Sequence, residues 1–185
     1  MENIRANPFN CVESPSQVTN QSSLTSRERQ ITTIASVIFG CGAIYETRAY
    51  SDGTRERGSF VNGKLNGPGK RIFPSGIIKE GNFKKGKLYG RGQILFPNRD
   101  VHSGQFMGGD LHGQGEKISF DGTKEEGKFK RGYLHGRGKR TYDDGIVDEG
   151  KFKWGELNGP GKVTYPNGET EVGRFEDGKL IRDES

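Results

Sequence analysis

The sequence predicts an all-β protein: a single-layer antiparallel solenoid of β-hairpin repeats, with a short N-terminal helix or cap. Three observations support this prediction. One pattern, clearest as GNFKKGKLYGRGQILFPN over residues 81–98, recurs with a constant step of 23 residues. Five columns of the aligned copies hold 26 of the 30 glycines, and phenylalanine and leucine columns recur at the same step. A fixed period of roughly 20 to 50 residues is typical of repeat arrays.

The glycine and apolar columns predict the same local structure in every unit. Glycine columns mark turns with positive φ, or places where two backbones crowd together. Leu, Ile, Val and Phe make up only about a fifth of the chain, too little to fill a thick core. We therefore expect a thin sheet in which each unit buries its Phe and Leu against its neighbours. The columns are Phe60, Phe83, Phe106, Phe129, Phe152 and Phe175, and Leu65, Leu88, Leu111, Leu134, Leu157 and Leu180.

The residues before the array divide into two stretches. Residues 1–24 are rich in Asn, Ser, Gln and Pro without a period, and are expected to be a disordered tail. Residues 25–57 are expected to hold a cap and a degenerate first repeat. Thr25 with Glu28 forms a capping-box pattern, and Ile31, Ile34 and Ile38 recur at helical spacing. Many β-branched residues there suit a strand instead, but we favour a helix that covers the open edge of the first hairpin.

Residues 58–185 are predicted to form the repeat array, with five full units and one half-unit. In the second unit we expect one strand at about Ile78–Lys84, a glycine-rich turn, and a second strand at about Gln93–Phe96. Two strands per unit advance the sheet by about 10 Å. Arg99 replaces the glycine of the turn between units, which predicts a looser turn there. Phe120 stands one residue later than the other closing aromatics, which predicts a bulge.

The core pattern G-x-F-x-x-G-x-L-x-G-x-G, followed by an aromatic and a turn glycine, resembles the MORN (membrane occupation and recognition nexus) repeat over about residues 58–185. The segments LHGQG and LHGRG are nearest to the family form. The resemblance implies a non-catalytic scaffold, since similar repeats are implicated in protein–protein scaffolding and in association with acidic phospholipids. The chain departs from the family where an aromatic usually precedes the first glycine, at Arg57, Glu80, Ser103, Glu126, Glu149 and Val172.

No catalytic, metal-binding or cofactor-binding site is expected, and neither enzyme activity nor a small-molecule substrate. His112 and His135 occupy one column in adjacent repeats, so they should lie about 10 Å apart. That spacing is too long for both to bind one zinc ion directly. No Ser or Cys has a His and an acidic partner fixed beside it. Acidic pairs such as Glu125 with Glu126 recur with the repeat, which is typical of solvated strand ends.

The positive charge of the chain is concentrated in two adjacent repeats. The formal net charge is +5, and residues 58–103 hold a large cationic excess, whereas residues 104–126 are net acidic. Such a basic stripe can bind anionic lipid headgroups or an acidic peptide, and the alternative left open is a lysine-coated sheet that binds nothing. Nucleic acid is not expected as a partner, because the aromatic columns should be buried. The candidate anionic-ligand patch is Lys64, Lys70, Arg71, Lys79, Lys84, Lys85, Lys87, Arg91 and Arg99.

Three aromatic residues outside the repeat columns are candidate partner contacts: Tyr89 and Tyr133, expected in turns, and Trp154. An exposed Trp in a turn anchors a partner or a membrane interface, or folds back over Lys153. The favoured function is a scaffold that binds a protein partner along an elongated β-sheet surface. The alternative is a peripheral membrane module that recognises anionic phospholipids through residues 64–99. The two cysteines offer no disulfide framework, so we expect a cytoplasmic protein, or one at the cytoplasmic face of a membrane.

Overall fold

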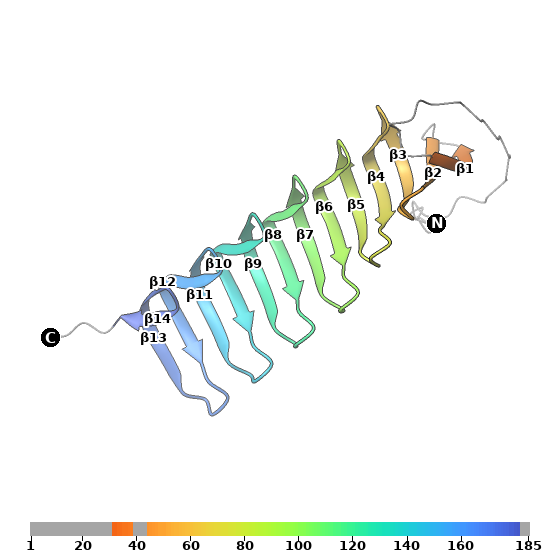
Figure 1. Ribbon diagram of the computed structural model, residues 1–185. Helices are drawn as coiled ribbons and strands as arrows, with labels where there is room; N and C mark the ends of the chain where they lie inside the picture. Colours follow the sequence, from red (N-terminus) through yellow and green to blue (C-terminus); the bar gives the residue numbers. More distant parts are fainter. Residues whose placement is uncertain (1–30, 39–43, 182–185) are drawn as a thin grey trace, which may run out of the picture.

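The computed structural model describes residues 31–38 and 44–181, and within these ranges fourteen strands form one antiparallel sheet in sequence order (Figure 1). Each strand is hydrogen-bonded to the strands before and after it in the chain, so the sheet is a long ribbon. The predicted all-β hairpin solenoid is therefore confirmed. The strands are β1 Ile31–Ile38, β2 Ile44–Tyr50, β3 Arg55–Val61, β4 Lys64–Ile72, β5 Ile78–Lys84, β6 Lys87–Leu95, β7 Val101–Met107, β8 Asp110–Ile118, β9 Lys124–Lys130, β10 Tyr133–Thr141, β11 Val147–Lys153, β12 Glu156–Thr164, β13 Thr170–Glu176 and β14 Lys179–Ile181.

The N-terminal helix that the sequence favoured is wrong, because residues 31–38 form strand β1. β1 pairs with β2 in antiparallel register, from Ile31 opposite Tyr50 to Ile38 opposite Ile44. Its β-branched residues fit a pleated strand, and the edge of β2 supplies backbone partners that a helix would leave unpaired. Strand β1 therefore covers the edge of β2 that the helix was expected to cover. Thr25, Glu28 and the tail at 1–24 lie outside the described residues.

The hairpin turns are shorter than the sequence suggested. β5 has the predicted bounds, but β6 begins at Lys87, so the turn is only Lys85 and Gly86. Gly90 and Gly92 consequently lie within β6 rather than in a turn. Gly92 lies opposite Gly81 at a point where the two backbones are too close for side chains. A Cβ on Gly81, which has φ of +138°, would lie 2.4 Å from the Gly92 Cα.

Successive hairpins are joined through their turns. The backbone N–H of Gly86 donates to the carbonyl oxygen of Leu65 in the preceding hairpin at 2.8 Å. The same bond recurs in the later hairpins, at Gly109 to Leu88, Gly132 to Leu111, Gly155 to Leu134 and Gly178 to Leu157. The Leu and Phe columns lie beneath these turns, and Leu65 and Leu134 have no exposed surface. The core is therefore one continuous row along the ribbon, as the repeat pattern predicted.

The bulge predicted at Phe120 is absent. Ser119 takes the place of the closing aromatic, and its N–H donates to Thr123 O at 2.9 Å, as Phe96 donates to Asp100. Phe120 is left 69% exposed in the loop. The unit therefore keeps its length and carries a serine where the other units carry an aromatic residue. Arg99 also keeps the regular turn hydrogen bond, to Phe96 O, at a φ of 74° that other units give to glycine.

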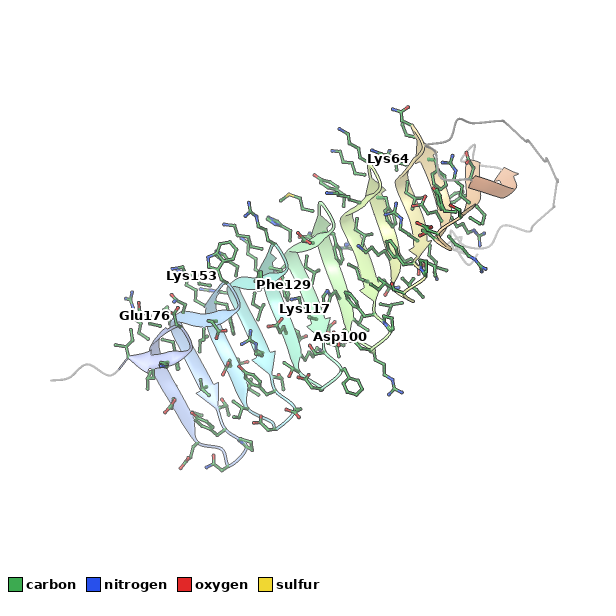
Figure 2. The ribbon with its side chains drawn as sticks, in the orientation of Figure 1. Lys64, Asp100, Lys117, Phe129, Lys153 and Glu176 are labelled. Carbon is green, nitrogen blue, oxygen red and sulfur yellow. The ribbon has the colours of Figure 1, made fainter. Side chains whose placement is uncertain are left out.

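The ribbon has two faces and two long edges, and these names are used below. Side chains alternate along each strand, and the inner face is the one that carries the Phe and Leu columns; the outer face is opposite. One edge is formed by the hairpin turns and the other by the loops between units. Figure 2 shows Lys64 and Lys153 along the hairpin-turn edge, Asp100 along the loop edge, and Phe129 between them.

Candidate functional site

A ladder of charged side chains crosses the inner face from strand to strand. Arg140 on β10 donates from Nη2 to Glu125 Oε1 on β9 at 2.7 Å, and also donates to the carbonyl oxygen of Gly155 in the next hairpin turn. Arg71 makes the same pair of contacts three repeats earlier, with Glu56 and with Gly86 O at 2.9 Å. Each arginine thus ties three neighbouring segments together. The basic column is Arg48, Arg71, Lys117 and Arg140, and the acidic column is Glu56, Glu125, Asp148 and Glu171.

The basic column also covers the buried phenylalanines. The Arg48 guanidinium carbon lies 3.8 Å from the centroid of the Phe60 ring, which suits a cation–π contact. Lys117 and Arg140 stand over Phe129 and Phe152 at 5.7 and 5.6 Å. Sequence reasoning missed this column, although its signal was present: a cation stands twelve residues before the repeat phenylalanine in four of the units.

Tyrosines at the loop edge extend the ladder. The hydroxyl of Tyr50 donates to Glu56 Oε2 at 2.6 Å, and that of Tyr142 to Asp148 Oδ2 at 3.0 Å. Burial, together with the hydrogen bond to Glu56, raises the pKa of Tyr50 to about 12. Burial likewise raises the pKa of Asp148 above its ordinary value. The ladder is partly withdrawn from water, since the side chains of Arg140 and Glu125 are only 14% and 16% exposed.

The acidic column is interrupted in the middle of the sheet, where Lys79 and His102 replace the carboxylates. Lys79 is half-buried, and no carboxylate among the described residues lies within ion-pair distance of it. Its Nζ stands 5.5 Å from the Phe73 centroid, and burial and the charge of Arg71 lower its pKa. His102 packs edge-on against Phe96, and its pKa is lowered by burial and then by Lys117. Lys79 is therefore a cation without an ion-pair partner among the described residues. Arg71 beside it is paired with Glu56, and the charge of Asp110 acts on Lys79 only from beyond ion-pair distance.

Two hollows adjoin at this stretch and form a groove on the inner face. One, of about 420 Å³, is lined by residues that include Tyr50, Glu56, Lys64, Arg71 and Phe73. The second, of about 280 Å³, lies beside it and is lined by Arg71, Lys79, Lys87, Leu88 and Asp110, with Gly86, Gly108 and Gly109 at the hairpin turns. Arg71 belongs to both hollows, so they follow each other along the ribbon. This pair of hollows is called the groove.

The structure divides the predicted basic patch among different surfaces. Arg71 and Lys79 face the groove. Lys70 lies on the outer face, where its Nζ is 3.2 Å from Glu80 Oε2. Alternation along β6 places Arg91 on the outer face as well, and Arg99 lies in a loop between units. The remaining four lysines stand at or beside the hairpin turns, where Lys64 and Lys87 also line the groove: Lys64, Lys84, Lys85 and Lys87. The nine cations therefore do not form one surface.

The three aromatic candidates are exposed, but two of them lie in strands rather than in turns. Tyr89 is in β6 with Lys84 Nζ 4.9 Å from its ring, and Tyr133 begins β10. Trp154 is in a turn, at a φ of 53°, and is 47% exposed. Its ring packs edge-on against His135, with the ring centroids 5.0 Å apart, and Lys130 Nζ lies 5.3 Å from its centroid. Trp154 therefore packs against the preceding hairpin.

Among the described residues, no group of three or more His, Cys, Asp or Glu side chains is arranged to hold a metal ion. Across the same part of the chain, no helix has the length and apolar character needed to cross a membrane.

Comparison with known proteins gives one family and several distant structures. The family model of the MORN repeat matches residues 57–78, 80–101, 102–124, 126–147 and 149–170. A solved TCP domain of SAS-4 (dCPAP) of Drosophila melanogaster, in complex with a proline-rich motif of Ana2 (dSTIL), is 14% identical; the match covers 85% of this chain and 96% of that chain, with a TM-score of 0.44. The wild-type TCP10 domain of Danio rerio CPAP is 21% identical over 86% of this chain and 91% of that one, with a TM-score of 0.29. No curated protein sequence matches the chain.

Proposed function

Since the chain belongs to the MORN repeat family, we propose that it is a non-catalytic scaffold that binds a protein partner along the inner face of its sheet. The partner segment is extended and carries a carboxylate, which is seated in the groove beside Lys79. The proposal includes a cytoplasmic location.

The observation that carries this proposal is the break in the inner-face ladder. At four other positions of the column of Lys79 the side chain is a carboxylate, and two of these, Glu56 and Glu125, bind the arginines of the next strand. At Lys79 the fold keeps a half-buried ammonium group beside a second cation, Arg71. Partial burial of a cation without an ion-pair partner costs folding free energy. A carboxylate from a partner would complete the ladder and remove that cost.

The surroundings of Lys79 indicate the form of the partner. The hollow beside it is lined by apolar Leu88 and by glycines at the hairpin turns, which leave room for a backbone to approach closely. The groove continues past Arg71 into the larger hollow, so a chain lying in it would run along the ribbon. An acidic residue flanked by apolar side chains fits this combination. Folded domains with flat surfaces fit it less well.

The test uses a set of fluorescent synthetic peptides, each with one or two Glu residues among apolar ones, and measures anisotropy with the full chain. Lys79→Glu should abolish binding of the peptides that the wild type binds. The matched control is Lys162→Glu, which makes the same change of charge at an exposed outer-face position. Equal loss in both variants would show only general electrostatic attraction and would overturn the proposal, as would the absence of any binding peptide.

A second candidate function, peripheral membrane binding, is supported by the hairpin-turn edge near the N-terminal end. Lys64, Lys84, Lys85 and Lys87 lie together there, and Tyr89 is exposed beside them. Juxtamembrane lysines attract anionic lipids, and the attraction weakens as salt rises. Flotation with vesicles that contain phosphatidylserine or phosphoinositide, at low and physiological salt, tests this candidate. A triple variant with Glu at positions 84, 85 and 87 should stay unbound, and vesicles without anionic lipid should not bind the wild type.

A further inference from the structure

A cluster of cations surrounds one histidine on the outer face, in repeats that the sequence did not single out. His135 lies on the central strand β10, with Lys128 and Lys130 on β9 at one side and Lys151 and Lys153 on β11 at the other. These four lysines alternate onto the same face as the imidazole. They are also the charges that act on it, because after burial they account for the lowered pKa of His135.

The imidazole at the centre of this cluster has an unused polar atom. Nδ1 of His135 is buried and has no hydrogen-bond partner among the described residues. That edge of the ring is covered by neighbouring protein atoms, so a ligand on the outer face contacts the lysines and not Nδ1. Trp154 packs edge-on against the same ring and Lys130 stands over the indole, so the histidine is held in place. Four ammonium groups around a fixed imidazole are a favourable arrangement for an anion.

We propose that Lys128, Lys130, Lys151, Lys153 and His135 form a binding site for a compact anion that carries several phosphate groups. This site lies on the face opposite the groove and is independent of the partner proposed above. The spacing supports a ligand with several charges: lysines two residues apart on one strand are about 7 Å apart, and β9 and β11 are about 10 Å apart. The four side chains are thus attached over an area that a pyrophosphate or a phosphorylated ring covers better than a single small anion does.

The neighbouring repeats lack this combination. The equivalent of His135 one repeat earlier, His112, is flanked on β7 by Gln105 and Met107 instead of lysines. One repeat later the equivalent residue is Asn158. The cluster is therefore a property of one place in the sheet and does not follow from the repeat pattern.

A compact anion fits this surface better than a planar anionic membrane does. Acidic side chains interrupt the same long edge on both sides of the cluster, with Asp110 in the hairpin before it and Glu156, Glu176 and Asp177 after it. A flat anionic surface that contacted the cluster would also meet these carboxylates, which it would repel. A ligand that covers only β9 to β11 avoids Asp110, Glu176 and Asp177, and Glu156, opposite Lys153 on β12, borders the site.

Trp154 gives the test a direct signal, since it is the single tryptophan of the chain and touches His135. The full chain is titrated with pyrophosphate and with inositol hexakisphosphate in physiological salt, with sulfate as the control anion, and its fluorescence is followed. The wild type should show a saturable change with the phosphate compounds. The double variant Lys128→Ala, Lys151→Ala should bind the phosphate compounds at least about tenfold more weakly, because it loses charged hydrogen bonds.

The control variant is Lys84→Ala, Lys85→Ala, which removes two lysines from a hairpin turn that has no imidazole, and it should bind as the wild type does. Equal weakening in both double variants, or no saturable change with either phosphate compound, would overturn the proposal. A second arm presents the same phosphate groups on vesicles that contain a phosphoinositide. Binding to the vesicles without binding to the soluble compounds would also overturn it, in favour of a membrane ligand.

Discussion

Arg140→Ile is expected to lower the free energy of unfolding by about 3 kcal/mol, because it leaves a buried carboxylate without its main partner. The Glu125 side chain is only 16% exposed, and Arg140 donates to its Oε1 from Nε at 3.1 Å and from Nη2 at 2.7 Å. Charged hydrogen bonds contribute about 1.5–3 kcal/mol each. Among the described residues, the one cation that then remains within ion-pair distance of Glu125 is Lys117, at 3.8 Å. The strand itself accepts isoleucine, since Ile94 occupies the same column.

The double variant Glu125→Leu, Arg140→Ile separates the ion pair from packing. With both charges replaced by apolar groups, the cost should fall to about 1 kcal/mol, because exchanging a buried pair for apolar side chains is often nearly neutral. The assay is urea denaturation followed by circular dichroism, with hydrogen exchange to show whether the loss is confined to β9–β12. A cost below about 1 kcal/mol for Arg140→Ile, or an equal cost for the single and double variants, would refute the reasoning.

Three further predictions follow from single positions. Ser119→Tyr should raise the urea midpoint and add about 1 kcal/mol, because a tyrosine there can donate to Glu125 as Tyr142 does to Asp148; an unchanged midpoint would contradict the register assigned to Ser119. Arg99→Gly should add about 0.5–1 kcal/mol in the same assay, since it removes a side chain held at a φ of 74°; a loss would mean that the Arg99 side chain has a structural role. The pKa of His102 is lowered from its ordinary value of 6.5, so below about pH 6.5 the unfolded chain binds a proton that the folded chain does not, and the folded state should become less stable. His102→Gln should therefore make the urea midpoints at pH 7.5 and pH 5.5 more nearly equal. An unchanged difference between the two midpoints would argue against this role of His102.

The repeat fold could be predicted from the sequence because its determinants are periodic. A Phe, a Leu and the paired glycines recur at one step, and each forms the same contact in every unit, such as Gly81 against Gly92. The strand β1 could not be predicted in this way. It has no copy in the array, and its helical spacing and its β-branched composition point to different structures. Its pairing with β2 decided between them, and that contact is not visible in the sequence.

The candidate surfaces were less predictable, because a count of charges along the chain ignores strand alternation. Lys70 and Arg71 are adjacent in sequence, yet one pairs with Glu80 on the outer face and the other binds Glu56 on the inner face. Conversely, Lys128 and Lys151 are 23 residues apart and flank one histidine. Reading each repeat as two alternating sets of columns would have revealed the inner-face ladder, including its break at Lys79. The unpaired Nδ1 of His135 depends on packing against neighbouring side chains and has no sequence signal.

The most direct test of the proposed function compares two adjacent positions on one strand. A photo-crosslinking amino acid is placed at His102, which faces the inner side of β7, or at Ser103, which faces the outer side. Each full-length variant is irradiated with the acidic peptide that binds the wild type most tightly, and the products are mapped by mass spectrometry. The proposal predicts crosslinking from position 102 and little from position 103. Crosslinking mainly from position 103 would contradict binding on the inner face.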